Sequence, residues 1–319
     1  MTRTRPMLIL PLMLVAACSS PSPTPSPASS PAPSPAPAPS GVRVVATVEV
    51  GQEAYGLAVT DDAVWATSFQ GGTLTRVDPA TNTAGAPLRL GVGAATLMAE
   101  GGSLWVGGYG DPATVWRVDP ASGKVVDTVS AGELCCDFAW DGRSAWAVDP
   151  RGAVLRVGGA ERWPILMDRN AHTNVVYAGG LLWASSDTTV LTATDPATGE
   201  ARRRIEVGGG VPFLVHDGLL WGAAPTRLWA IDPATARTVR EVPLTDSIEV
   251  LALAFAGDDI WVGIRRPGRV GAVLRLSATG AVLDELREVD VPARIAFGFG
   301  SVWVTDSGSG SLLRIATGS

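Results

Sequence analysis

Two adjacent cysteines, Cys135 and Cys136, directly precede Asp137 and are the residues most able to do redox chemistry in this chain. In an exported protein such a pair can close into a vicinal disulfide, and strained or exposed disulfides are the redox-active ones. The alternative is that both are small residues where a structural unit begins, one buried as a small hydrophobe and one facing out. The pair therefore leaves open a redox or ligand sensor.

A histidine is the second candidate for chemistry. His172 can act as a base or a metal ligand, with Glu53, Asp137 or Glu249 as a carboxylate partner. A metal site normally needs three or more converging ligands, and the sequence contains no His/Cys cluster at ligand spacing. We therefore expect no bound metal, no cofactor and no catalytic constellation, with His172 at a rim.

Three arginines share one short segment, Arg265-Arg266-Pro267-Gly268-Arg269. The chain has 25 Lys and Arg against 31 Asp and Glu, a net charge of −6. A proline-stiffened arginine loop in such an acidic chain can clamp a carboxylate or phosphate, or it can be a solvated insertion. The acidic charge also argues against nucleic acid as a partner, because nucleic-acid binders carry a basic domain or stripe.

The elements that hold these residues are predicted by a repeated tryptophan. Seven tryptophans return at intervals of 40, 41, 37, 38, 40 and 42 residues. A period near 40 residues indicates one supersecondary unit copied along the chain. The repeated residues are Trp65, Trp105, Trp146, Trp183, Trp221, Trp261 and Trp303.

Each copy has the pattern of four short antiparallel strands. An apolar strand and a Gly/Asp turn precede the tryptophan, whose own strand follows. The third strand often ends in Asp-Pro, as at Asp78-Pro79 and Asp119-Pro120, which favours a type I turn before an outer strand. Four such strands every 40 residues or so predict an all-β fold, a single seven-bladed β-propeller.

The two ends of the repeat region complement one another. The last copy has only three predicted strands, whereas residues 42–50 match the outer strands of the other copies. The N-terminal strand should therefore complete the last blade and close the ring, which removes exposed sheet edges. We expect residues 41–319 to form this one domain, as a monomer.

Propellers bind ligands at one end of the central channel, here where the first strands begin and the tryptophan strands end. The residues predicted there form a polar ring of both signs, which suits a small polar ligand or a peptide loop. A merely solvated rim is the alternative. The candidates are Glu53, Tyr55, Tyr109, Cys135, Cys136, Asp137, His172, Asn174, Glu249, Arg265, Arg266, Arg269, Arg294 and Asp306.

Two runs resemble a known superfamily. Val302-Trp303-Val304-Thr305-Asp306 and the run from Leu74 to Asn82 look like YVTN-type and virginiamycin B lyase-like propellers. The resemblance implies the fold over all seven copies, but that superfamily mixes lyases and binding modules. Its lyases use histidine and glutamate with magnesium near the channel, and their full set does not map onto this chain, where His172 is the one candidate histidine.

The N-terminus has the features of a targeting segment. Arg3 and Arg5 precede an apolar stretch at 7–16, and the run from Leu14 to Cys18 resembles a bacterial lipobox. The resemblance implies removal of residues 1–17 and lipidation of Cys18; an ordinary signal peptide is the alternative. Residues 19–40 are Ser, Pro, Ala and one Thr, so 18–40 is expected to be an extended stalk.

These features together predict an exported, membrane-anchored β-propeller that acts as a ligand- or protein-binding or scaffold module. It would be attached to the outer face of the bacterial cell membrane, or to an outer membrane if one is present. An envelope lyase or hydrolase is one alternative function, and a sensor that uses the cysteine pair is the other.

Overall fold

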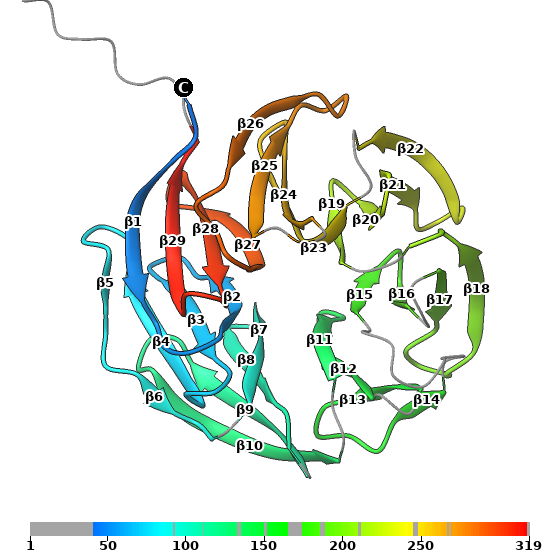
Figure 1. Ribbon diagram of the computed structural model, residues 1–319. Coiled ribbons are helices and arrows are strands. Elements are labelled where there is room, and N and C mark those ends of the chain that lie inside the picture. Colours follow the sequence, from blue (N-terminus) through cyan, green and yellow to red (C-terminus); the bar gives the residue numbers. More distant parts are fainter. Residues whose placement is uncertain are drawn as a thin grey trace, which may run out of the picture. The chain divides into compact units, whose positions relative to one another are not determined.

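The computed structural model describes residues 41–91, 93–110, 112–132, 135–149, 152–164, 174–185, 189–209, 212–244, 248–266, 268 and 270–317. Every regular element in these residues is a β-strand. The strands belong to one compact unit, Ser40–Ser319, and form seven antiparallel sheets around a ring (Figure 1). This confirms the predicted seven-bladed β-propeller.

The first four blades follow the chain in order, each with its first strand nearest the centre of the ring (Figure 1). In blade 1 the outer strand is split into two short pieces, β5 and β6, which both pair with β4. The strands are β2 (Ala54–Val59), β3 (Val64–Ser68), β4 (Thr73–Asp78), β5 (Thr83–Ala84) and β6 (Leu88–Arg89) in blade 1; β7 (Ala94–Glu100), β8 (Ser103–Gly108), β9 (Ala113–Asp119) and β10 (Lys124–Gly132) in blade 2; β11 (Cys135–Trp140), β12 (Ala145–Asp149), β13 (Ala153–Arg156) and β14 (Arg162–Pro164) in blade 3; and β15 (Val175–Ala178), β16 (Leu181–Ser185), β17 (Val190–Thr194) and β18 (Ala201–Glu206) in blade 4.

Blades 5 and 6 have the same order, and blade 7 takes its outer strand from the other end of the domain. The strands are β19 (Phe213–His216), β20 (Leu219–Ala224), β21 (Arg227–Asp232) and β22 (Arg237–Pro243) in blade 5; β23 (Glu249–Ala256), β24 (Asp259–Arg265), β25 (Gly271–Leu276) and β26 (Val282–Leu286) in blade 6; and β27 (Pro292–Gly298), β28 (Ser301–Asp306), β29 (Ser311–Ala316) and β1 (Arg43–Glu49) in blade 7.

The ring closes as predicted, because β1 pairs with β29 in an antiparallel register that runs from Arg43 opposite Ala316 to Glu49 opposite Ser311. Val48 on β1 is 5% exposed and packs in a core cluster with Trp303 and Leu312. Closure therefore joins the ends of the domain through backbone hydrogen bonds and through buried apolar surface.

The repeated tryptophans lie on the second strand of each blade, and all but Trp105 are buried. In five blades the indole N–H donates to the residue five positions earlier, at the end of the first strand or in the turn after it. This bond holds the inner hairpin turn, and the ring fills the space between neighbouring sheets. The acceptors are Thr60 Oγ1, Glu100 O, Asp141 Oδ2, Ala178 O and Gly298 O for Trp65, Trp105, Trp146, Trp183 and Trp303.

The Asp-Pro turns form as predicted, and carbonyls between the third and fourth strands also join neighbouring blades. Asp78 accepts from the Ala80 N–H at 2.7 Å, and Asn82 takes the left-handed conformation with φ of 57°. A donor on the preceding blade then reaches a carbonyl of the turn between the third and fourth strands. These donor–acceptor pairs are Arg314 to Pro79, Trp163 to Pro196, Arg203 to Ala234 and Arg240 to Ala278.

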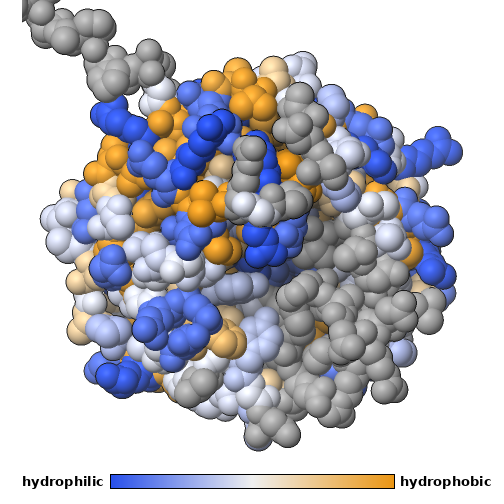
Figure 2. Space-filling view, in the orientation of Figure 1, coloured by the Kyte–Doolittle hydropathy of each residue, from blue (hydrophilic) through white to orange (hydrophobic). Residues whose placement is uncertain are grey.

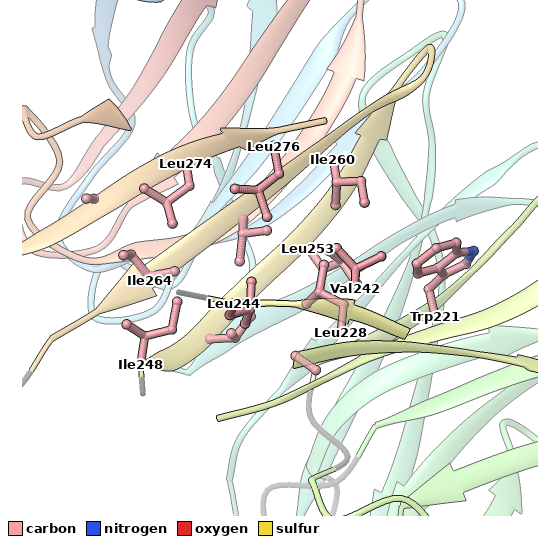
Figure 3. Close-up of a cluster of buried hydrophobic side chains, with 14 of the residues drawn as sticks. Trp221, Leu228, Val242, Leu244, Ile248, Leu253, Ile260, Ile264, Leu274 and Leu276 are labelled. Carbon is pink, nitrogen blue, oxygen red and sulfur yellow. The ribbon is translucent and has the colours of Figure 1, made fainter. Parts of the chain in front are cut away.

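The largest buried cluster lies between blades 5 and 6. Figure 3 shows Leu274 and Leu276 of β25 on one side of it and Leu244 and Ile248 on the other. Large aliphatic side chains here, on the facing sheets of two blades, stabilise the ring at the place where the chain passes from β22 to β23.

Candidate functional site

Three of the predicted channel residues converge from three different blades. Arg294 on β27 donates through Nη2 to both carboxylate oxygens of Asp137 on β11, at 3.2 Å each. The guanidinium carbon of Arg294 lies 4.8 Å from the ring centroid of Tyr55 on β2. Blades 1 and 2 separate blade 7 from blade 3, so this ion pair spans the centre of the ring.

Each of the three residues lies in or next to a β-bulge of its inner strand, and β7 and β23 have the same kind of bulge. The register shifts between Ala54 and Leu57 on β2, between Cys135 and Phe138 on β11, and between Pro292 and Arg294 on β27. A bulge bends its strand and re-aims a side chain. Tyr55 and Asp137 lie within their bulges and Arg294 directly follows its own.

The ion pair is largely removed from solvent, with 27% of the Arg294 side chain and 23% of the Asp137 side chain exposed. Burial raises the pKa of Asp137 above its ordinary value, and the charge and hydrogen bond of Arg294 oppose that shift only in part. For Arg294, burial disfavours the charged form, but Asp137 and Tyr55 outweigh it and raise the pKa of the guanidinium. The pair is thus weakly solvated, and burial opposes the ionised form of Asp137.

A second ion pair lies at the channel end of blade 6. Glu249 and Arg265 are register partners on β23 and β24, and the guanidinium donates to both carboxylate oxygens at 2.8 and 2.9 Å. About half of each side chain is exposed. In three blades the register partners place the start of the first strand beside the end of the second strand, as expected. These partners are Glu249 with Arg265, Pro292 with Asp306, and Ala54 with Ser68.

Four other candidates lie at this end with different partners. Gln70 donates to Glu53 Oε1 at 2.8 Å, and the ring of Tyr109 lies 5.7 Å from that of Phe69. Asn174 is buried and donates to the Phe213 carbonyl of the next blade at 2.9 Å. Asp306 is also buried, and its carboxylate accepts the backbone N–H groups of Asp290, Val291 and Gly308.

Asn174 and Asp306 thus hold the backbone of the rim. Arg266 has a different partner from Arg265. It pairs with Glu285 on the outer strand of blade 6 at 2.7 Å. Sequence reasoning did not single out Glu285, which has no motif around it and lies on an outer strand. The two described arginines of the predicted clamp therefore have separate acidic partners.

Several candidates cannot be placed. His172, Arg269 and Cys18 lie outside the described residues. Cys135 and Cys136 belong to the backbone of β11, with Cys136 in the bulge beside Asp137, but their side chains lie outside the described part of the structure. Within the described residues there is no group of three or more His, Cys, Asp or Glu able to hold a metal ion.

Figure 2 shows one end of the ring, where hydrophilic residues border the middle and apolar residues gather over β26 and its neighbours. Fold and site together define a seven-bladed β-propeller with a polar cluster across its channel, an architecture that supports a binding or scaffold module in general. No family model and no curated protein matches the sequence. Among the described residues no helix has the length and apolar character to span a bilayer.

Proposed function

We propose that the protein is a membrane-anchored, extracytoplasmic binding module that takes a charged polar ligand or peptide segment at the channel cluster. The observation that carries this proposal is the convergence of Tyr55, Asp137 and Arg294 from three bulged inner strands. They bring a cation, a carboxylate and an aromatic ring to one point, and the side chains of Arg294 and Asp137 remain 27% and 23% exposed.

The ligand that fits this cluster carries charges of both signs. If an anion alone took Arg294 from Asp137, the carboxylate would remain poorly solvated and unpaired, which is strongly unfavourable. A ligand with an anionic and a cationic group pairs with both residues, and the face of Tyr55 adds a surface for a cation. A free amino acid, a peptide terminus or a charged peptide loop meets this requirement.

Thermal unfolding with three simple probes tests the proposal. Diglycine, which carries both charges, should raise the melting temperature of the wild type, whereas acetate and methylammonium should do so much less. The double variant Asp137→Asn/Arg294→Gln should lose the response. The matched control, Asp62→Asn/Arg76→Gln, removes an exposed ion pair of blade 1 and should keep it. Equal shifts in both double variants would contradict the proposed site.

The anchor and location rest on the N-terminal features, namely the basic start, the apolar stretch, the lipobox-like run and the Pro-rich segment. Two acyl chains at Cys18 would hold the protein stably at a membrane. A Cys18→Ser variant should leave the membrane fraction, whereas Ser20→Ala should stay there. Retention of Cys18→Ser in the membrane would reject the anchor. The resemblance to YVTN-type and virginiamycin B lyase-like propellers is compatible with a binding role.

A further inference from the structure

A cavity of about 300 Å³ lies on the outer side of blade 6, away from the channel cluster. Four aliphatic side chains that are each less than 9% exposed form its floor. One wall is the outer strand β26, where Val282 is 48% exposed at the mouth. The aliphatic residues are Leu244, Ile248, Leu274 and Leu276, shown in Figure 3.

The polar side of the cavity is an arginine–glutamate pair, to which an exposed arginine outside the lining adds a third charge. Arg266 and Glu285 both line it, and Arg266 Nη1 lies 2.7 Å from Glu285 Oε1. Arg287 holds the other oxygen of the same carboxylate at 3.0 Å. Two guanidinium groups share one carboxylate, so this trio carries a net charge of 2 − 1 = +1.

The trio stays charged at neutral pH. The hydrogen bond from Arg287, together with Arg266, holds the pKa of Glu285 below its ordinary value. Each guanidinium carries five N–H donors in a planar fork, so pairing with Glu285 leaves further donors that an incoming anion can accept from. A single added negative charge would neutralise the trio.

We propose that this cavity is a second binding site, for an amphiphilic carboxylate with one short unbranched apolar chain. The apolar chain would lie over the leucine and isoleucine floor, and the carboxylate would accept hydrogen bonds from Arg266 at the rim. Most of the lining residues are aliphatic and two are charged, and small-molecule sites of this volume are typically lined by apolar side chains with a few polar groups. The site shares no residue with the channel cluster, so it stands or fails independently of the function proposed above.

Isothermal titration calorimetry with octanoate on the full chain carrying Cys18→Ser tests the proposal. Octanoate should bind with one site, whereas acetate, which has the head alone, and octylammonium, which has the opposite charge, should not bind measurably. Arg266→Gln should weaken octanoate binding about tenfold, because a charge-assisted hydrogen bond is lost. Val282→Trp should abolish binding by filling the mouth from an exposed position.

Two matched variants separate this site from general effects. Val239→Trp adds the same ring at an exposed position of β22 that does not line the cavity, and Arg202→Gln removes a paired arginine of blade 4. Both should bind octanoate as the wild type does. Binding that survives Val282→Trp, or that octylammonium shows equally, would overturn the proposal, as would no octanoate binding to a folded wild type.

Discussion

Thr305 on β28 donates its hydroxyl to the backbone carbonyl of Tyr55 on β2 at 2.8 Å, across the junction where the ring closes. The same oxygen accepts the backbone N–H of Arg294 at 3.1 Å. One side chain therefore joins blade 7 to blade 1 and also fixes the backbone of two residues of the channel cluster. Thr67 makes the corresponding bonds with Gly56 and Ala95, between blades 1 and 2.

Replacement of this hydroxyl should lower the stability of the ring. Thr305→Val preserves the shape but leaves one backbone donor and one acceptor unpaired at a buried position, which costs about 1–3 kcal/mol. Urea denaturation measures this loss. Thr83→Val, at an exposed position of β5, is the matched control and should change stability little. A Thr305→Val protein as stable as that control would show that the junction does not depend on the bond.

Loss of Arg294 should destabilise the protein in a pH-dependent way. Arg294→Gln leaves Asp137 poorly solvated and without its cation, at an expected cost of about 1–3 kcal/mol near pH 7, less than for a fully buried pair. The pKa of Asp137 is raised in the folded state, so the folded protein binds a proton more readily than the unfolded chain. The destabilisation should therefore shrink as pH falls through that raised pKa and Asp137 becomes neutral.

Denaturation of the wild type, Arg294→Gln and Asp137→Asn/Arg294→Gln at several pH values checks this sign. The double variant, which has no buried carboxylate, should recover part of the lost stability near pH 7. If the destabilisation of Arg294→Gln instead grew towards acid pH, Asp137 would not be the group that titrates.

The bulge on β2 should tolerate only glycine at position 56. A Cβ on Gly56 would overlap the Ala95 carbonyl oxygen and come within 2.8 Å of the Leu97 Cβ on the neighbouring blade. Gly56→Ala should therefore cost at least about 2 kcal/mol through overpacking. Gly85→Ala, where the nearest atom is 3.3 Å away, is the control. Equal melting temperatures of the two variants would show that blades 1 and 2 can separate enough to admit a methyl group.

Removal of the closing strand should have a much larger effect than removal of the segment before it. A chain that begins at residue 41 keeps β1 and should retain the melting temperature of the full chain. A chain that begins at residue 51 lacks β1, exposes the edge of β29 and loses the buried Val48. We expect it to aggregate or melt well below the longer form in calorimetry. Similar melting of both chains would mean that blade 7 is stable with three strands.

The architecture was largely predictable because its signals are local and repeated. The spacing of the tryptophans, the Asp-Pro turns and the unmatched strand at residues 42–50 each reflect backbone chemistry within a single blade. The pairing of β1 with β29 was predictable for the same reason, since each copy has the same apolar pattern. Seven copies of one pattern predict the same strand order in every blade.

The partners of the rim residues were not predictable in the same way. Periodicity placed Tyr55, Asp137 and Arg294 at one end of the channel, but a bulge depends on register across two strands, and their meeting depends on the ring diameter. The sequence also grouped Arg265 with Arg266, whereas strand geometry directs one to Glu249 and the other to Glu285.

The sequence by itself therefore determined the number of blades and the strand that closes the ring, because these follow from local patterns repeated along the chain. Only the tertiary structure decided which charges meet, since Arg294 and Asp137 are 157 positions apart and contact each other solely because seven blades curve into a closed ring.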